Sequence, residues 1–76
     1  MTLTHADAER IARELALARG WMWREPVRVS PRRRFVLFGR VTSFEVWSNA
    51  DRRGANVVVV IDGGSGEVLR SAYLPR

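Results

Sequence analysis

Residues 43–74 read SFEVWSNADRRGANVVVVIDGGSGEVLRSAYL, and this stretch holds the densest β-forming run of the chain, the VVVVI at 57–61. Five consecutive β-branched residues are stiff about χ1 and fit a pleated surface well. Turn-forming residues flank the run at 49–54 and at 63–66, which places it between two predicted hairpin turns. Because polar residues do not alternate within it, the run indicates either a strand covered on both faces or a sheet with one face left for a partner.

The segments beside this run predict further strands. In the segment before it, alternation places Phe44 and Val46 on one face of a strand and Glu45 and Trp47 on the other. A last strand is expected at 67–73, after the glycine-rich turn. These segments together predict an antiparallel meander.

The region upstream of the meander is harder to interpret. Residues 25–31 alternate apolar and polar side chains between two prolines, which is typical of an edge strand or an extended segment. Arginines occupy 32–34 and predict a charged turn before a second short apolar run at 35–39.

The first twenty residues predict an amphipathic helix over about 5–19. Thr4 is a favourable N-cap, and Asp7 three residues later provides the acidic partner of a capping box. Gly20 is suited to the left-handed conformation that ends helices. One apolar stripe runs along the helix, formed by Ala8, Ile11, Ala12, Leu15 and Ala18.

These elements predict an α+β fold in a single domain over 1–76, with one N-terminal amphipathic helix packed on a three- to four-stranded antiparallel sheet. The net charge is +5 and every basic residue is an arginine. A basic surplus can attract nucleic acid, acidic proteins or membrane surfaces. No apolar stretch approaches the roughly 20 residues that cross a bilayer, and the first residues lack the apolar core of a secretory signal. We therefore expect a cytoplasmic protein without membrane contact.

The residues that usually carry chemistry are sparse. Cysteine is absent and His5 is the one histidine, so no nucleophile has a recognisable base beside it, and we expect no enzymatic activity. The segment 62–67 lacks the alternating acids of a calcium loop. A hairpin turn, with Asp62 capping it through its side chain, explains this segment instead. The sequence thus predicts neither a metal nor a cofactor.

The motif IDGGSGEVL at 61–69, preceded by FEVW at 44–47, resembles the V-x-ID-x-x-TGEVL hairpin of PepSY-like domains. Ser65 stands where that family usually has threonine, and the segment 21–39 has no counterpart in it. The early helix of the family also matches, through Ala8, Ile11, Ala12 and Leu15.

The resemblance implies a cystatin-like α+β module that is non-catalytic and is associated with peptidase regulation or protein binding. PepSY-like domains are often secreted or membrane-associated, and no signal or anchor is recognised here. A second resemblance, to NTF2-like immunity proteins, rests on the order helix, proline-rich segment, strand, glycine turn and strand. It implies the same single sheet with a helix packed on it.

One helix covers one face of a sheet, so the opposite face is the main candidate site. Trp47, Val58 and Val60 are expected on that face, where they would bind an unidentified protein partner or a second copy in a homodimer. The alternative is that the segment 21–39 folds over this face and buries it inside the chain. That segment offers five large apolar residues for the purpose, Trp21, Trp23, Phe35, Leu37 and Phe38.

A second hypothesis is single-stranded nucleic-acid binding. Its basic patch would consist of Arg32, Arg33 and Arg34, extended by Arg52 and Arg53 from the hairpin loop. Tryptophans at 21 and 23 could stack on bases, although the sequence has no recognised nucleic-acid-binding signature. The first hypothesis, a small non-enzymatic protein-interaction or regulatory module, fits the apolar residues better.

Overall fold

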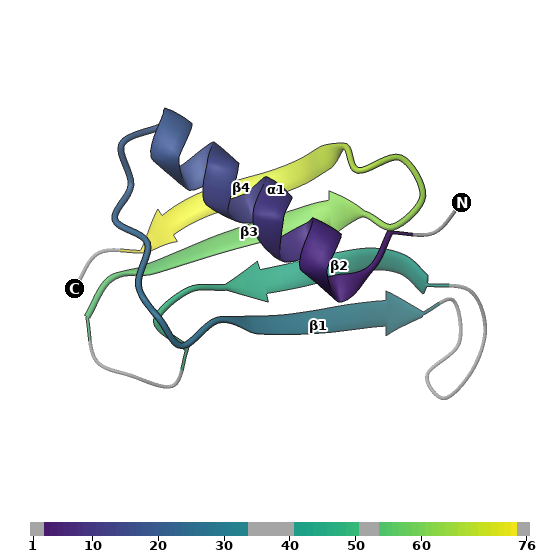
Figure 1. Ribbon diagram of the computed structural model, residues 1–76, viewed down its shortest axis with the longest axis horizontal. Coiled ribbons are helices and arrows are strands. Elements are labelled where there is room, and N and C mark those ends of the chain that lie inside the picture. The colour runs from purple at the N-terminus through teal and green to yellow at the C-terminus, as the bar shows by residue number, and fades with distance from the viewer. Residues whose placement is uncertain (1–2, 34–40, 51–53, 75–76) are drawn as a thin grey trace.

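The computed structural model describes residues 3–33, 41–50 and 54–74. It consists of helix α1 (His5–Ala18) and strands β1 (Arg28–Arg33), β2 (Val41–Trp47), β3 (Asn56–Asp62) and β4 (Val68–Leu74). The strands form one antiparallel sheet in the order β1-β2-β3-β4. Figure 1 shows α1 lying across one face of this sheet. The predicted α+β fold, with one helix on an antiparallel meander, is confirmed.

Both ends of α1 carry the predicted capping signals. The amide of Asp7 donates to Oγ1 of Thr4, and the amide of Thr4 donates back to Oδ2 of Asp7, each over 3.1 Å, which completes a capping box. At the other end Gly20 has φ of +72°. The amide of Trp21 donates to the carbonyl of Ala16 over 2.8 Å, and that of Gly20 to the carbonyl of residue 17 over 3.2 Å. These two bonds form a Schellman motif.

The hydrophobic core lies between α1 and one face of the sheet. The helix contributes only small side chains at its centre line, Ala8, Ala12 and Ala16, and all three are fully buried. The expected stripe was therefore wrong at Ala18, which is exposed, because the burial follows a spacing of four from Ala8. The bulk of the core comes from the sheet, through Phe44, Val46, Val57, Val59 and Ile61.

Strand β1 corrects one prediction and confirms another. Arg32 and Arg33 were expected in a turn but continue the strand, because they pair with Ser43 and Val41 of β2. The arginine at 34 and the apolar run at 35–39 lie outside the described residues. The expected edge strand is confirmed, and it contains Pro31, a residue that sheets tolerate mainly on their edge strands.

The two edge strands of the described sheet differ in character. Strand β1 carries Pro31 and three arginines, which are features that discourage pairing with another chain. Strand β4 contains no proline, and its Leu69 and Leu74 are exposed. Of these two edge strands, β4 is therefore the one better able to pair with a strand of another chain.

The turn between β3 and β4 is built as expected around Asp62. Its Oδ2 accepts from the amides of Gly64 and Ser65, over 3.1 and 2.8 Å, and from the hydroxyl of Ser65 over 2.9 Å. Gly63 is buried, donating to the carbonyl of Thr42 and accepting from the amide of Leu3, both over 2.9 Å. The β3–β4 turn is thus hydrogen-bonded both to β2 and to Leu3, the residue before the helix N-cap.

Candidate functional site

Strand register places a second set of side chains on the sheet face opposite α1, which we call the open face. Trp47 lies between Arg28 of β1 and Val58 of β3, and Val58 in turn pairs with Ala72 of β4. Because neighbours of the core residues along each strand must point away from the core, the predicted orientation of Trp47, Val58 and Val60 agrees with the register. The open face comprises Arg28, Ser30, Arg32, Ser43, Glu45, Trp47, Val58, Val60, Asp62, Arg70, Ala72 and Leu74.

Exposure differs among the three predicted binding residues. Trp47 and Val60 are half-buried, whereas Val58 is only 8% exposed. Val58 therefore contributes little accessible surface, and the apolar surface that a partner could reach comes from Trp47, Val60, Ala72 and Leu74.

The described part of the segment 21–39 packs on the helix side. Trp21, Trp23 and Val27 all contact the core beneath α1. The ring of Trp21 stacks on Tyr73 of β4 with centroids 6.0 Å apart, and the guanidinium of Arg19 lies 5.3 Å from the Trp21 centroid. Residues 21–33 thus leave the open face uncovered. The three other apolar residues proposed as a cover, Phe35, Leu37 and Phe38, lie outside the described residues.

A hydrogen-bonded chain across β1 and β2 fixes the indole of Trp47. Its Nε1 donates to Oε1 of Glu45 over 2.9 Å, and Nη2 of Arg32 donates to Oε2 of Glu45 over 3.4 Å. The Glu45 side chain is 19% exposed and that of Arg32 is 65% exposed. The sequence analysis placed Glu45 on the same strand face as Trp47 and assigned it no partner. The spacing of two between Glu45 and Trp47 was an available signal, whereas the partner on β1 depended on strand register.

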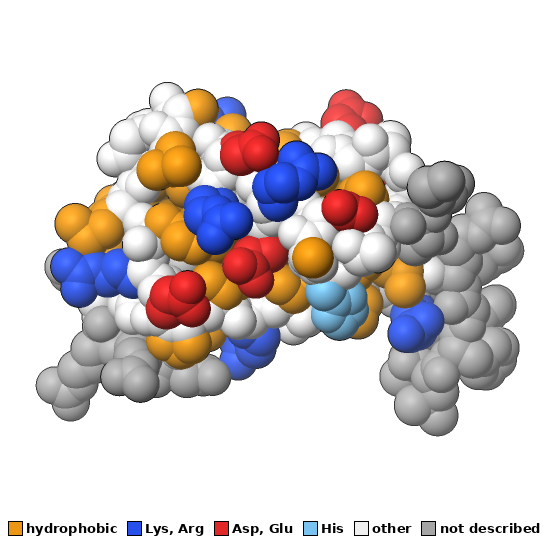
Figure 2. Space-filling view, viewed as in Figure 1, with side chains coloured by type: hydrophobic (Ala, Val, Ile, Leu, Met, Phe, Trp, Pro, Cys, Tyr) orange, Lys and Arg blue, Asp and Glu red, His pale blue; other side chains and the backbone are white. Residues whose placement is uncertain are grey.

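Among the described residues, the open face carries three arginines and two acids. Arg28, Arg32 and Arg70 lie there, against Glu45 near the centre and Asp62 at one end. The opposite surface is different, since acidic and basic side chains alternate over α1 (Figure 2). Three ion pairs link them there, Arg10 with Asp7 and Glu14, and Arg13 with Glu9, over 3.4 to 4.0 Å.

The structure describes two residues of the predicted basic patch, Arg32 and Arg33. Arg32 lies on the open face, and the register shifts between it and Arg33. Arg34, Arg52 and Arg53 lie outside the described residues. The tryptophans at 21 and 23 belong to the core region, as described above. The register also brings Arg28 of β1 and Arg70 of β4 to the same side of the sheet as Arg32, and the linear sequence did not indicate that Arg70 joins them.

A polar cluster closes the end of the sheet near the 49–54 hairpin. The amide nitrogen of Asn56, a residue only 7% exposed, donates to the carbonyls of Ser48 and Asn49 over 2.9 and 2.8 Å. The backbone amides of Asn49 and Ala50 donate to the carbonyls of Arg24 and Pro26, over 2.7 and 2.9 Å. Sequence analysis missed this cluster because Asn49 looked like an exposed turn residue.

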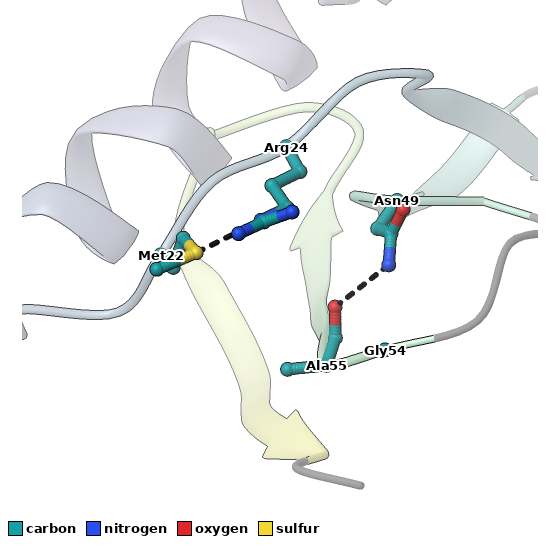
Figure 3. Close-up of a pocket in the computed structure, with 5 residues that line it drawn as sticks. All are labelled: Met22, Arg24, Asn49, Gly54 and Ala55. Atoms are coloured by element: carbon teal, nitrogen blue, oxygen red, sulfur yellow. Dashed lines mark hydrogen bonds between the residues drawn. The ribbon is translucent and has the colours of Figure 1, made fainter.

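A pocket of about 220 Å³ borders this cluster (Figure 3). Nε of Arg24 donates to Sδ of Met22 over 2.9 Å, and Nδ2 of Asn49 donates to the carbonyl of Ala55 over 3.2 Å. Nε of Arg24 and Nδ2 of Asn49 therefore already have acceptors within the chain. The pocket is lined by Met22, Arg24, Asn49, Gly54 and Ala55. It lies where the segment after α1 is hydrogen-bonded to the hairpin between β2 and β3, so we assign it a structural role.

Two carboxylates, those of Asp62 and Asp7, serve local structure. Hydrogen bonds from the Ser65 amide and hydroxyl, and from the Gly64 amide, lower the pKa of Asp62 below its ordinary value. Those from Thr4 lower the pKa of Asp7, with a smaller effect of Arg10. The structure, over the residues it describes, groups no three His, Cys, Asp or Glu residues where they could hold a metal ion.

His5 is exposed on the first turn of α1, and its ring meets that of Phe44 edge-on at 5.5 Å. Within the ranges 3–33, 41–50 and 54–74, no helix is both long and apolar enough to cross a bilayer. No protein-family model matches the chain, and no curated protein or solved structure matches it.

Proposed function

We propose that this protein is a small, non-enzymatic protein-interaction or regulatory module that binds a peptide or protein on its open face. One observation carries the proposal. The indole of Trp47, the last residue of β2, is held by Glu45 on a sheet face that α1 and residues 21–33 leave uncovered.

Several physical features support this function. Tryptophan and arginine are the residues that contribute most often to the binding energy of protein interfaces. The Glu45 hydrogen bond orients the indole before binding, so less side-chain entropy is lost when a partner covers it. Because Nε1 already has an acceptor within the chain, a partner can cover the ring without supplying one. Val60 adds apolar area beside the ring, and the arginines form a polar rim.

The resemblance to PepSY-like domains supports the same conclusion. Its hairpin motif falls on the Asp62 turn, and its helical residues fall on α1. A helix on an antiparallel meander is compatible with a cystatin-like module, and the second resemblance, to NTF2-like immunity proteins, implies the same layer arrangement. We therefore propose a PepSY-like, cystatin-like interaction domain that acts in the cytoplasm.

Trp47→Ala tests the proposal, with Leu17→Ala as a control, because Leu17 is 67% exposed and lies on the helix. Each variant is immobilised, and the proteins that it retains from a lysate of the source cells are quantified by mass spectrometry. We expect proteins retained by the parent and by Leu17→Ala to be depleted on Trp47→Ala. Far-ultraviolet circular dichroism verifies that both variants remain folded. An identical set of retained proteins for all three would refute the proposal.

Self-association through the open face is measured by light scattering. A parent dimer that dissociates in Trp47→Ala would identify the partner as a second copy. A monomeric parent whose mass Trp47→Ala leaves unchanged would exclude the homodimer.

The grouping of Arg28, Arg32 and Arg70 around one tryptophan favours a second candidate, the binding of single-stranded nucleic acid. Phosphate contacts make such binding fall steeply with salt. Fluorescence anisotropy of a labelled single-stranded RNA, titrated at low and at raised salt, tests this candidate. Absence of binding at low salt would exclude it.

A further inference from the structure

We propose that this protein forms a homodimer in which β4 of one copy pairs antiparallel with β4 of a second copy, about a two-fold axis at Ala72. The occupant of this sheet edge is thus a second copy of the chain. The proposal goes beyond the function of the open face, because pairing along β4 leaves Trp47 of both copies uncovered.

Strand β4 is the outer strand of the sheet on the side away from β1 (Figure 1). Among the described residues, no strand pairs with its outer side. It contains no proline and one arginine, and its Leu69 and Leu74 are exposed. An edge strand presents a row of unpaired N–H and C=O groups, which folded proteins usually protect. The lack of such protection on β4 indicates that this edge is paired in the assembled protein.

The hydrogen bonds of β3 identify the backbone groups of β4 that point outward. The carbonyl of Val57 accepts a hydrogen bond from the segment after β2, so Val57 bonds toward β2 and the next residue, Val58, bonds toward β4. Val58 pairs with Ala72, whose N–H and C=O therefore point back to β3. The residues on either side, Ser71 and Tyr73, direct their N–H and C=O outward.

Outward-pointing residues must lie opposite one another, and this requirement limits the register. A pairing centred on Arg70 would oppose two arginines. One centred on Ser71 would place Leu69, where the register with β3 shifts, opposite Tyr73, and one centred nearer the end of β4 would leave most of the strand unpaired. Centring on Ala72 uses only the regular part of β4. It lets Ser71 of each copy exchange both backbone hydrogen bonds with Tyr73 of the other.

The same register brings compatible side chains together on both faces of the sheet. Two small residues, Ala72 and its copy, meet at the axis and allow the strands to approach closely. Beside them Leu74 lies opposite Arg70 of the second copy, whose methylenes can cover it. On the helix side, the small Ser71 lies opposite the ring of Tyr73. The two Arg70 residues are separated along the strands by four residues, which is about 13 Å at about 3.3 Å per residue, so like charges do not meet.

The first measurement is the mass of the purified chain in solution. Light scattering from about 10 µM to about 1 mM covers the affinities of small interfaces. We expect the mass to rise to twice the 8.7 kDa of one chain, in the parent and in Trp47→Ala alike. A parent that stays monomeric would overturn the proposal and leave β4 to a strand of another protein. A dimer that Trp47→Ala dissociates would place the interface on the open face and would also overturn it.

Introduced cysteines report the register, because the chain has none of its own. Ala72→Cys sets two residues across the axis in a non-hydrogen-bonded pair, with Cα atoms about 4.5 Å apart, within the range of a disulfide. Ser71→Cys sets them diagonally, about 7–8 Å apart, which disulfides bridge only if the backbone moves. Ala6→Cys, exposed on the first turn of α1, measures random collision.

The three cysteine variants are oxidised mildly and followed on non-reducing gels. We expect Ala72→Cys to form the covalent dimer at least about tenfold faster than the other two, because the paired strands hold its thiols at a high effective concentration. Equal rates for all three variants would overturn the proposal. A fastest reaction in Ser71→Cys would overturn the register at Ala72.

A charge pair at the axis tests the same contact without a covalent bond. Ala72→Glu and Ala72→Arg each oppose like charges in a self-dimer, so we expect the dissociation constant of each to rise about threefold to fivefold. An equimolar mixture should recover the parent affinity, because the carboxylate then lies opposite the guanidinium. Circular dichroism verifies that both variants are folded. A mixture that dimerises no better than either variant alone would overturn the proposal.

Discussion

Replacing Asn56 by alanine should destabilise this protein markedly, because this polar side chain at the start of β3 is buried. The side-chain amide of Asn56 donates to two main-chain carbonyls over 2.8 and 2.9 Å, and both carbonyls belong to buried residues. Asn56→Ala removes both donors and leaves the carbonyls without them in a site that water cannot readily enter.

The size of the effect follows from these two bonds. Each is worth about 0.5–1.5 kcal/mol net, and a buried acceptor left unpaired adds to the loss, so we expect about 2–3 kcal/mol. A chain of this length has a total stability of about 4–11 kcal/mol. The midpoint of thermal unfolding should fall by about 10–20 °C, since 1 kcal/mol shifts it by about 4–8 °C in small domains. Asn56→Asp, nearly identical in shape, should be at least as damaging because its carboxylate would face the same carbonyls.

The control is Thr42→Val, which keeps a β-branched side chain but removes an exposed hydroxyl that donates to the carbonyl of Arg32 over 3.1 Å. Its effect should stay within about 0.5 kcal/mol, as for most surface substitutions. Urea unfolding followed by tryptophan fluorescence and by circular dichroism measures all three variants. Equal midpoints for Asn56→Ala and Thr42→Val would refute the claim that the polar cluster holds this end of the sheet.

Three further predictions concern packing and pH. Ala12→Leu should lower the free energy of unfolding by about 1–3 kcal/mol, because the residue is fully buried between α1 and the sheet, whereas exposed Ala18→Leu should be nearly neutral in the same urea titration. Gly63→Ala should lower the free energy of unfolding by a similar amount, because its new Cβ would lie 2.8 Å from a backbone oxygen of β2. Gly64→Ala is the control, since its Cβ would lie 3.5 Å from a carboxylate oxygen, an ordinary contact distance. Thermal melts should show a lower midpoint for Gly63→Ala than for Gly64→Ala. Hydrogen bonds depress the pKa of Asp62 from its ordinary 3.8, so its stabilising contribution is present above that pH and disappears as pH falls through the lower folded value. Unfolding midpoints at pH 6 and below pH 4 should therefore differ less in Asp62→Asn than in the parent, and an unchanged difference would contradict the assignment.

The sequence predicted the positions of the helix and strands more accurately than it predicted which residues contact one another in the folded chain. Caps and alternation are local signals, so Thr4, Asp7 and Gly20 indicated the ends of α1, and alternation indicated the faces of β2. The turn expected at Arg32 and Arg33 was wrong because pairing with β2 outweighed the local preference of a charged run. The buried stripe of α1 ends at Ala16 rather than at the predicted Ala18. The difference in burial between these two alanines depends on how α1 lies on the sheet.

The candidate site was predictable in its apolar part and not in its charged part. Trp47 and Val60 follow from strand phase alone. The arginines around them come from β1 and β4, and their meeting on one face depends on strand order and register. The joint formed by Asn49 and Asn56 was missed for a related reason: the carbonyls of Arg24 and Pro26, which hold Asn49 and its neighbour in place, lie more than twenty residues away in the sequence.

The unequal edges of the sheet limit how this protein could assemble. Strand β1 carries Pro31 and three arginines, which discourage pairing with another strand, while β4 has no proline and a single arginine, Arg70. If two molecules joined through β4, the combined eight-stranded sheet would present β1 at both of its outer margins. Because neither margin readily accepts another strand, growth would stop at two molecules rather than continue into a fibril.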